Sequence, residues 1–299
     1  MFADSDWMQG PNPYTEMMEE CASRAQRGEA GRKDGWAVLK EMEQFGIVPN
    51  HETFTSLVKV LAKAAKHGNA KAKHGDEVIA EMRARGLEPT VVTASLLLSL
   101  YARDVMRGGD VSLDKAWAVV KDVGSGGDEY VYAGLMDVCA KLSMNGKAGM
   151  RDAESIISHM DSSGVEGDVY VWNSMVQVCV HSLKNMEGGT TFEDAVHLLS
   201  KMIQHDVEPD HFTFSLLFSA AARAVQTNQT RADEAISLLK ARMKESGVAP
   251  NLVVYNSILS VYVKAAELGQ VRGPSKPRVA AQPNRLLAMS RVLVDTQSV

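Results

Sequence analysis

Apolar residues recur along this chain at intervals of three and four positions, and short polar segments interrupt them at regular distances. After Asp168, for example, Val171, Met175, Val178 and Cys179 fall on one face of a helix. A polar turn and a second apolar-periodic segment follow. The pattern predicts pairs of amphipathic helices joined by short turns.

A recurring stop-and-start signal separates the helix pairs. At its first clear occurrence, Gly46 is followed by Pro49, Asn50 and His51. Glycine suits a left-handed C-cap, proline cannot continue a helix, and asparagine is a good N-cap. We therefore expect one helix to end just before Gly46 and the next to begin at His51. The glycine follows a methionine by four residues in the pairs Met42/Gly46, Met82/Gly86, Met160/Gly164 and Met243/Gly247.

The signal divides the chain into repeated units of 38 to 42 residues. A lone helix pair cannot bury its apolar face, whereas stacked pairs bury a continuous core and form a concave surface. The sequence therefore predicts an all-α fold, a right-handed α-solenoid (superhelix) of about seven helix-turn-helix repeats. We expect an N-terminal lead at 1–10, an array at 11–269 and a C-terminal tail at 270–299. The units of the array are 11–50, 51–90, 91–128, 129–168, 169–210, 211–251 and a partial unit at 252–269.

Composition and motifs exclude several classes of protein. With 45% hydrophobic and 23% charged residues, the chain is typical of a folded protein. Its most apolar run, 91–102, is too short to span a membrane. The cysteines and histidines show no zinc-ligand spacing, and no nucleophile elbow, phosphate loop or deaminase motif is present. We therefore expect no enzyme activity, metal, cofactor, small-molecule substrate or membrane association.

The N-terminus carries Asp4 and Asp6 and no Arg-rich amphipathic segment, so no signal or transit peptide is visible. This indicates either a cytoplasmic protein or a mature or truncated chain. The formal net charge is -5 and the pI is ≈ 5.9. By itself, this acidic balance disfavours nucleic acid as a partner.

Two stretches carry a resemblance to a known family. They are Pro250-Asn-Leu-Val-Val-Tyr-Asn-Ser-Ile-Leu and Glu81-Met-Arg-Ala-Arg-Gly-Leu-Glu-Pro. Together with the repeated joins across 11–265, they resemble the pentatricopeptide repeat. The family's unit has 35 residues, and the excess here falls in the turn between the two helices. The resemblance implies a solenoid that binds single-stranded RNA, one base per repeat, in RNA processing, stability or translation in a mitochondrion or chloroplast.

The family reads bases mainly with the fifth and the last residue of each unit. The fifth residues here are Thr15, Thr55, Ser95, Ala133, Asn173, Ser215 and Asn256. The last residues are Asn50, Thr90, Asp128, Asp168, Asp210 and Asn251. The family's rules pair Thr15/Asn50 and Ser215/Asn251 with adenine, Ser95/Asp128 with guanine and Asn173/Asp210 with uracil. The implied target, read 5′ to 3′ along the chain, is a track such as A-n-G-n-U-A.

Each of these assignments has a structural alternative. N-capping alone explains the last residues, and tight helix packing with locally bonded hydroxyl or amide groups explains the fifth residues. The fifth residues nevertheless recur as small polar groups on an otherwise apolar helix, which favours contact with a ligand. Thr55/Thr90 and Ala133/Asp168 match no defined rule.

The thirteenth residues give an independent signal because six of the seven are basic. They lie two helical turns after the fifth residues and near the same face, so they could follow an RNA backbone. The alternative is that each cation complements the C-terminal end of its own helix dipole. After Ser23 in the first unit, the row continues with Lys63, Arg103, Lys141, His181, Arg223 and Lys264.

The second residues flank each base in the family. Tyr130, Tyr170 and Phe212 are therefore candidates to stack on bases; packing between adjacent units is the alternative. Glu52 holds the same place in the second unit and is unfavourable beside RNA.

The tail carries Arg272, Lys276, Arg278, Arg285 and Arg291 against a single acid, Asp295. Two interpretations stay open for it, an incomplete repeat and a basic contact to RNA phosphates. For the whole chain, single-stranded RNA is the partner that we expect, with protein partners in a ribonucleoprotein assembly in addition. The alternative is a protein-binding helical-repeat scaffold within a larger assembly such as an organellar ribosome.

Overall fold

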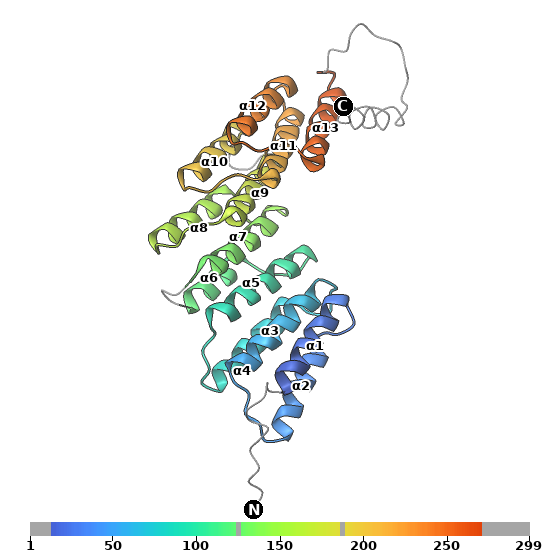
Figure 1. Cartoon of the computed structure of the whole chain (residues 1–299), viewed down its shortest axis with the longest axis vertical. Helices are drawn as coiled ribbons and strands as arrows, with labels where there is room; N and C mark the ends of the chain where they lie inside the picture. Colours follow the sequence, from blue (N-terminus) through green and yellow to red (C-terminus); the bar gives the residue numbers. More distant parts are fainter. Residues whose placement is uncertain (1–12, 124–126, 186–188, 271–299) are drawn as a thin grey trace, which may run out of the picture.

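The computed structural model of the protein describes residues 13–123, 127–185 and 189–270, and these form thirteen α-helices and no strand (Figure 1). The first helices of the units are α1 (Pro13–Arg27), α3 (His51–Ala65), α5 (Val91–Met106), α7 (Glu129–Ser143), α9 (Val169–Asn185), α11 (His211–Gln226) and α13 (Leu252–Glu267). The second helices are α2 (Arg32–Gln44), α4 (Ala72–Ala84), α6 (Leu113–Asp122), α8 (Met150–Ser162), α10 (Phe192–Gln204) and α12 (Ala232–Glu245). The predicted all-α solenoid is confirmed.

The helices form two layers that run the length of the described array (Figure 1). Each first helix packs against the first helices before and after it, and each second helix fills the groove between its own first helix and the next one. The second helices make few contacts with one another. Because the first helices lie closer together, they form the inner side of the curve, where a repeat protein presents its concave surface.

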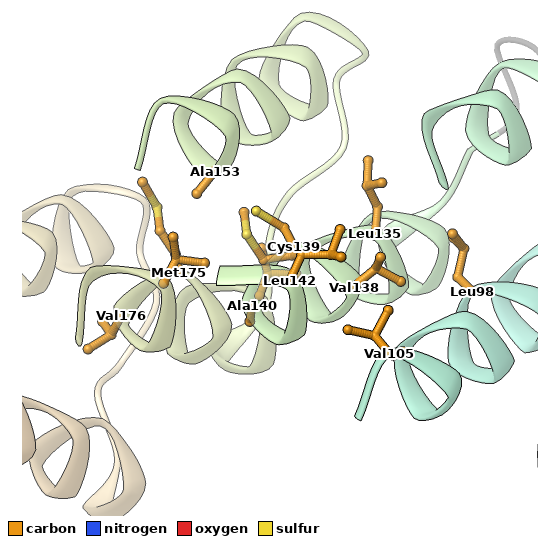
Figure 2. Close-up of a cluster of buried hydrophobic side chains, with 14 of the residues drawn as sticks. Leu98, Val105, Leu135, Val138, Cys139, Ala140, Leu142, Ala153, Met175 and Val176 are labelled. Carbon is orange, nitrogen blue, oxygen red and sulfur yellow. The ribbon is translucent and has the colours of Figure 1, made fainter. Parts of the chain in front are cut away.

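The core is continuous from unit to unit. Figure 2 shows side chains of α7, among them Leu135, Val138 and Leu142, between those of α5 and α9. Leu98 on α5 and Met175 on α9 close this layer from either side. Each first helix therefore contributes to two interfaces at once, which ties the stability of one unit to that of its neighbours.

The cysteines belong to this core, where each holds the eleventh position of its unit. Cys21, Cys139 and Cys179 are buried and free. Burial raises the pKa of Cys139 and Cys179 to about 12. A thiol with such a pKa is a poor nucleophile at neutral pH, so packing is the role that the structure gives them.

The predicted left-handed C-caps are confirmed. Gly46, Gly86, Gly164 and Gly247 have φ of +74°, +73°, +69° and +68°. In each case the amide of the following residue donates to the carbonyl of the recurring methionine; the distance from the Leu87 nitrogen to the Met82 oxygen, for example, is 2.9 Å. Asp206, with φ +57°, takes the glycine's place in the fifth unit.

The turns between first and second helices contact the preceding unit. In the turn that links α3 to α4, the His67 Nε2 atom lies 2.9 Å from the Gln26 carbonyl, and the Asn69 amide donates to the Gly28 carbonyl at 3.1 Å. In the next unit, the Arg107 guanidinium donates to the Lys66 carbonyl at 2.5 Å. These bonds satisfy carbonyls at the C-terminal end of a first helix, where the helix leaves them unpaired.

Several expectations lie outside the described residues, namely the lead at 1–10 and all the basic residues of the tail. Within the described helices, none is long and apolar enough to cross a membrane. The same residues contain no group of His, Cys, Asp and Glu side chains arranged to hold a metal ion.

We predict that the shared core makes α7 sensitive to truncation. Leu135→Ala removes a fully buried side chain and is expected to lower the free energy of unfolding by about 2–5 kcal/mol. Urea denaturation followed by circular dichroism measures this change. Leu238→Ala is the control, because Leu238 on α12 is 39% exposed and its truncation should stay within about 0.5 kcal/mol. Equal effects from the two variants would contradict the shared core.

Candidate nucleic-acid interface

The second, fifth and thirteenth residues of the units lie along one strip of each first helix. The second residues are the most exposed: Tyr130 is 65% exposed, Tyr170 51% and Phe212 46%. Val92 and Val253 hold the same place and are also exposed. The packing alternative therefore accounts for only part of each ring, and the rest of the ring is accessible to a ligand.

The last residues of the units are all N-caps. A side-chain oxygen of each accepts a hydrogen bond from the backbone amide three residues later, at distances from 2.7 Å for Asp210 to 3.3 Å for Thr90. The same geometry holds at Asn50, Asp128, Asp168 and Asn251. Capping is thus common to all six positions, and it explains why the first helices begin where the sequence places them.

Capping leaves half of each carboxylate or amide group uncommitted. At the five Asn and Asp positions the bonds run to Oδ1. Among the described residues, the Oδ2 atoms of Asp128 and Asp168 and the Nδ2 atoms of Asn50 and Asn251 have no hydrogen-bond partner. One side chain can therefore hold its helix end and still present an acceptor or a donor to a ligand.

In the fifth unit, the fifth and last residues touch. The Asn173 amide nitrogen donates to Asp210 Oδ1 at 3.3 Å, and the Thr213 hydroxyl donates to the Asn173 Oδ1 atom at 2.7 Å. Burial alone raises the pKa of Asp210, but the hydrogen bonds from Thr213 and Asn173 outweigh it and hold that pKa below its ordinary value. The pair assigned from the family resemblance is therefore adjacent in space, with Asn173 itself buried.

The fifth residues elsewhere are also engaged with neighbours. The hydroxyl of Thr55 lies 2.9 Å from that of Thr93, which lies 3.0 Å from that of Thr90. Ser215 lies 3.1 Å from Ser257 on α13, and the Ser95 hydroxyl donates to a backbone carbonyl of its own helix. The packing alternative is thus realised at several of these positions. By contrast, Asn256 on α13 is exposed, and Thr15 and Ala133 are partly exposed.

Sequence reasoning missed the third residues of the units. Thr53, Thr93 and Thr213 each donate or share a hydrogen bond with the last residue of the preceding unit. Thr93 and Thr213 also contact the fifth residue of that unit. The recurrence of threonine at one place in three units was the available signal.

The thirteenth residues lie in the last turns of their helices, as the dipole alternative requires. Three of them also have side-chain or carbonyl partners: Arg103 donates to the Ala62 carbonyl of the preceding unit, Lys141 pairs with Asp137 at 3.3 Å, and Lys264 pairs with Glu267 at 3.0 Å. The Nδ1 atom of His181 lies 2.9 Å from the Ser143 hydroxyl.

Arg223 differs from the rest of the row. Its guanidinium makes no hydrogen bond or ion pair with the described residues, and burial lowers its pKa. It lines a groove of ≈ 670 Å³ between α11 and α13, together with Lys264, Ser219 and Ser260. Two cations and two hydroxyl groups in one groove suit an anion with several oxygen atoms. Lys63, on α3, likewise has no partner for its ammonium group among the described residues.

The centre of the strip contains an acid that the sequence argument did not weigh. Burial, with the charges of Asp137 and Asp168, raises the pKa of Tyr170 to about 12. Asp137 on α7 also pairs with Lys141, so the charge of this acid acts both on a stacking candidate and on a member of the basic row.

Comparisons with known proteins agree with the repeat pattern. A family profile described as the pentatricopeptide repeat domain matches residues 37–103 and 197–265. The chain is 30% identical over 160 residues, 52% of its length, to the chloroplastic pentatricopeptide repeat-containing protein At3g49170 of Arabidopsis thaliana. The chain spans 16% of the length of that relative. The two stretches that the profile covers therefore match the pentatricopeptide repeat.

The fold of this chain has a solved counterpart. The crystal structure of the pentatricopeptide repeat protein PPR10 from maize matches with a TM-score of 0.52 and 18% sequence identity. The match covers 96% of this chain and 34% of that one. At this identity the likeness concerns the solenoid fold alone, and it supports the assignment of α1 to α13 as stacked repeats.

We predict that Asp210 makes stability depend on pH. Because its pKa is lower in the folded state, its contribution is present above the unfolded value near 3.8 and is lost as the pH falls through the folded value. Asp210→Asn keeps an N-cap but removes this titration. In urea denaturation at pH 7, the wild type should have a larger free energy of unfolding than the variant. This difference in the free energy of unfolding should become smaller at pH 3. Asp233→Asn, on the exposed face of α12, is the control, and a difference unaffected by pH would contradict the assignment.

Proposed function

We propose that this protein binds single-stranded RNA along the inner surface formed by its first helices. The observation that carries the proposal is the groove between α11 and α13, where Arg223 lacks a partner among the described residues and faces the same hollow as Lys264. A half-buried guanidinium is expected to have an anionic partner. A phosphodiester is the anion that a repeated basic row would accommodate.

Base selection is proposed at the ends of the units. The last residues are oriented by capping, and their free atoms differ in kind: Asn50 and Asn251 offer amide donors, whereas Asp128 and Asp168 offer acceptors. Donors and acceptors at fixed positions can discriminate among base edges. The fifth residues, with the third-position threonines, hold these groups in place. The proposed track remains A-n-G-n-U-A, with Tyr130, Tyr170 and Phe212 stacking on bases.

The proposed role is in RNA processing, stability or translation in an organelle. The Arabidopsis relative is named as chloroplastic, and the family resemblance points to a mitochondrion or a chloroplast. Catalysis is not part of the proposal, because the side chains along the strip offer hydrogen bonding, stacking and charge rather than a nucleophile with its base.

A protein-binding scaffold is the second candidate. The ion pair between Lys59 and Glu19 at 2.6 Å lies on the inner surface of the first two units, and Glu52, about two turns before Lys59 on α3, is exposed. These acids favour a basic protein segment over RNA at that end of the array. Shallow salt dependence and no preference among RNA sequences would support the scaffold.

The direct test is binding to a pool of random single-stranded RNA at 50 and 200 mM salt, followed by sequencing of the retained RNA. Five phosphate contacts predict a salt slope of about -3.5, so affinity should fall roughly a hundredfold over this range. Enrichment of a track like A-n-G-n-U-A would support base selection. Absence of binding at 50 mM salt would overturn the proposal in favour of the scaffold.

We predict that Arg223→Ala weakens binding to the enriched RNA. Loss of one phosphate contact should make the salt slope shallower by about 0.7. The control is Arg242→Ala on α12, where the arginine is exposed and paired with Glu245 at 3.2 Å. Fluorescence anisotropy across a salt series measures both variants. Equal slopes for Arg223→Ala and wild type would remove Arg223 from the interface.

A further inference from the structure

The second unit carries a run of positive charge that the base-reading surface does not use. From Thr53 to Gly75 the chain has no Asp or Glu, although its net charge is -5. The same stretch contains five lysines and two histidines. Three of the lysines, Lys66, Lys71 and Lys73, lie in or directly after the turn between α3 and α4, and we call these three the basic edge.

The basic edge is accessible and lacks counter-ions. All three side chains are exposed, and their ammonium groups form no ion pair with the described residues. Acids close to this edge are already engaged: Glu29 pairs with Arg27 at 2.9 Å, and Glu77 pairs with Arg32 at 2.7 Å. The positive field of the edge is therefore not neutralised from within the described chain.

The position of these lysines runs against the electrostatics of a helix start. The N-terminus of a helix favours acids and disfavours cations. The first turn of α4 has no acid and contains Lys73, with Lys71 at the N-cap making no side-chain cap. Burial, together with Arg32 and these lysines, lowers the pKa of His74 in the same turn. The other second helices have an acid there, namely Asp34, Asp114, Asp152, Glu193 with Asp194, and Asp233 with Glu234.

The missing cap is supplied from the next unit. The amide of Ala72 donates to Asp104 Oδ2 at 2.8 Å, and Asp104, on α5, is only 7% exposed. The buried carboxylate of Asp104 thus accepts a hydrogen bond from a free backbone amide at the start of α4. The exposed positions on either side of Ala72 are occupied by Lys71 and Lys73. Departures from a local rule without a structural gain are characteristic of functional surfaces.

The basic edge continues the thirteenth-residue row. Lys63, a member of that row, lies in the last turn of α3, three residues or about one turn before Lys66. The guanidinium of Arg107 lies against the Lys66 carbonyl and is also exposed. Nearer the start of α3, Glu52 is exposed and Glu19 neutralises Lys59. An RNA strand in the groove therefore meets repulsion near the start of α3 and attraction at its end.

We propose that the basic edge is a second, sequence-independent site that binds the phosphates of the RNA lying 5′ of the track read in the groove. The inference rests on the proposed function and on its 5′-to-3′ direction along the chain. The 5′ part of the strand leaves the inner surface at the first unit. His67 and Asn69, in the turn between α3 and α4, contact the end of α1 and the turn that follows it, so the basic edge lies next to this exit. The edge adds affinity without reading bases, because lysine contacts phosphate as a point charge.

The test compares three RNAs: the track enriched by selection, the same track with a 5′ extension of uridines, and the track with an equal 3′ extension. The variant carries Lys66→Gln, Lys71→Gln and Lys73→Gln. The matched control carries Lys121→Gln, Lys240→Gln and Lys244→Gln, which removes the same charge from exposed positions on α6 and α12. Circular dichroism and thermal unfolding verify that both variants fold.

For wild type, the 5′ extension should increase affinity and the 3′ extension should not do so to the same extent. The edge variant should lose roughly tenfold to a hundredfold in affinity for the 5′-extended RNA, with a salt slope shallower by about 2. Its affinity for the unextended track should match that of the control variant.

If the edge variant binds the 5′-extended RNA with unchanged affinity, this inference is overturned. The proposed RNA binding along the inner surface would still stand, provided that Arg223→Ala weakens binding. A failure of wild type to bind any of the RNAs at 50 mM salt would instead remove the proposed function together with the edge. Preferential loss of binding to a poly-glutamate peptide, with RNA affinity unchanged, would assign the edge to an acidic protein.

Discussion

The side-by-side packing of the first helices is the constraint on which the rest of the structure depends. Each of these helices is buried from two sides, as the layer around Leu135, Val138 and Leu142 shows in Figure 2. Because the second helices fill only the outer grooves, the inner surface is built from one helix of every unit. Residues at the same position of successive units therefore form a row on the inner surface. Such a row can serve as a linear binding track.

The joins between units give single residues two roles. Capping fixes the start of a helix with one atom of Asn50 or Asp168, and the other side-chain atom stays available. The opposition between a structural and a ligand-binding interpretation, which the sequence left open, is therefore not exclusive at these positions. At Asn173 the structure favours a structural role over ligand binding, since the side-chain amide is buried and hydrogen-bonded to Asp210 and Thr213.

Local chemistry explains which features were predictable from the sequence. The helices begin at His51, Val91 and Val169 as expected, because a capping side chain and a left-handed glycine act within a few residues of the chain. The contact of Arg103 with the Ala62 carbonyl and the capping of α4 by Asp104 were not predictable. These contacts depend on the offset of one unit relative to the next, and the sequence pattern of a single unit does not determine this offset.

The ion pairs between neighbouring second helices are distributed unevenly along the described array. Because the second helices make few other contacts with one another, an ion pair between two of them opposes their separation. Arg32 with Glu77 and Arg83 with Asp122 bridge α2, α4 and α6 at 2.7 Å. Between α8 and α10 the corresponding described contact is His205 with Asp161 at 4.0 Å. Close ion pairs therefore join neighbouring second helices in the N-terminal half of the described array. We expect the C-terminal half to adjust its pitch more readily to the spacing of a ligand along its inner face.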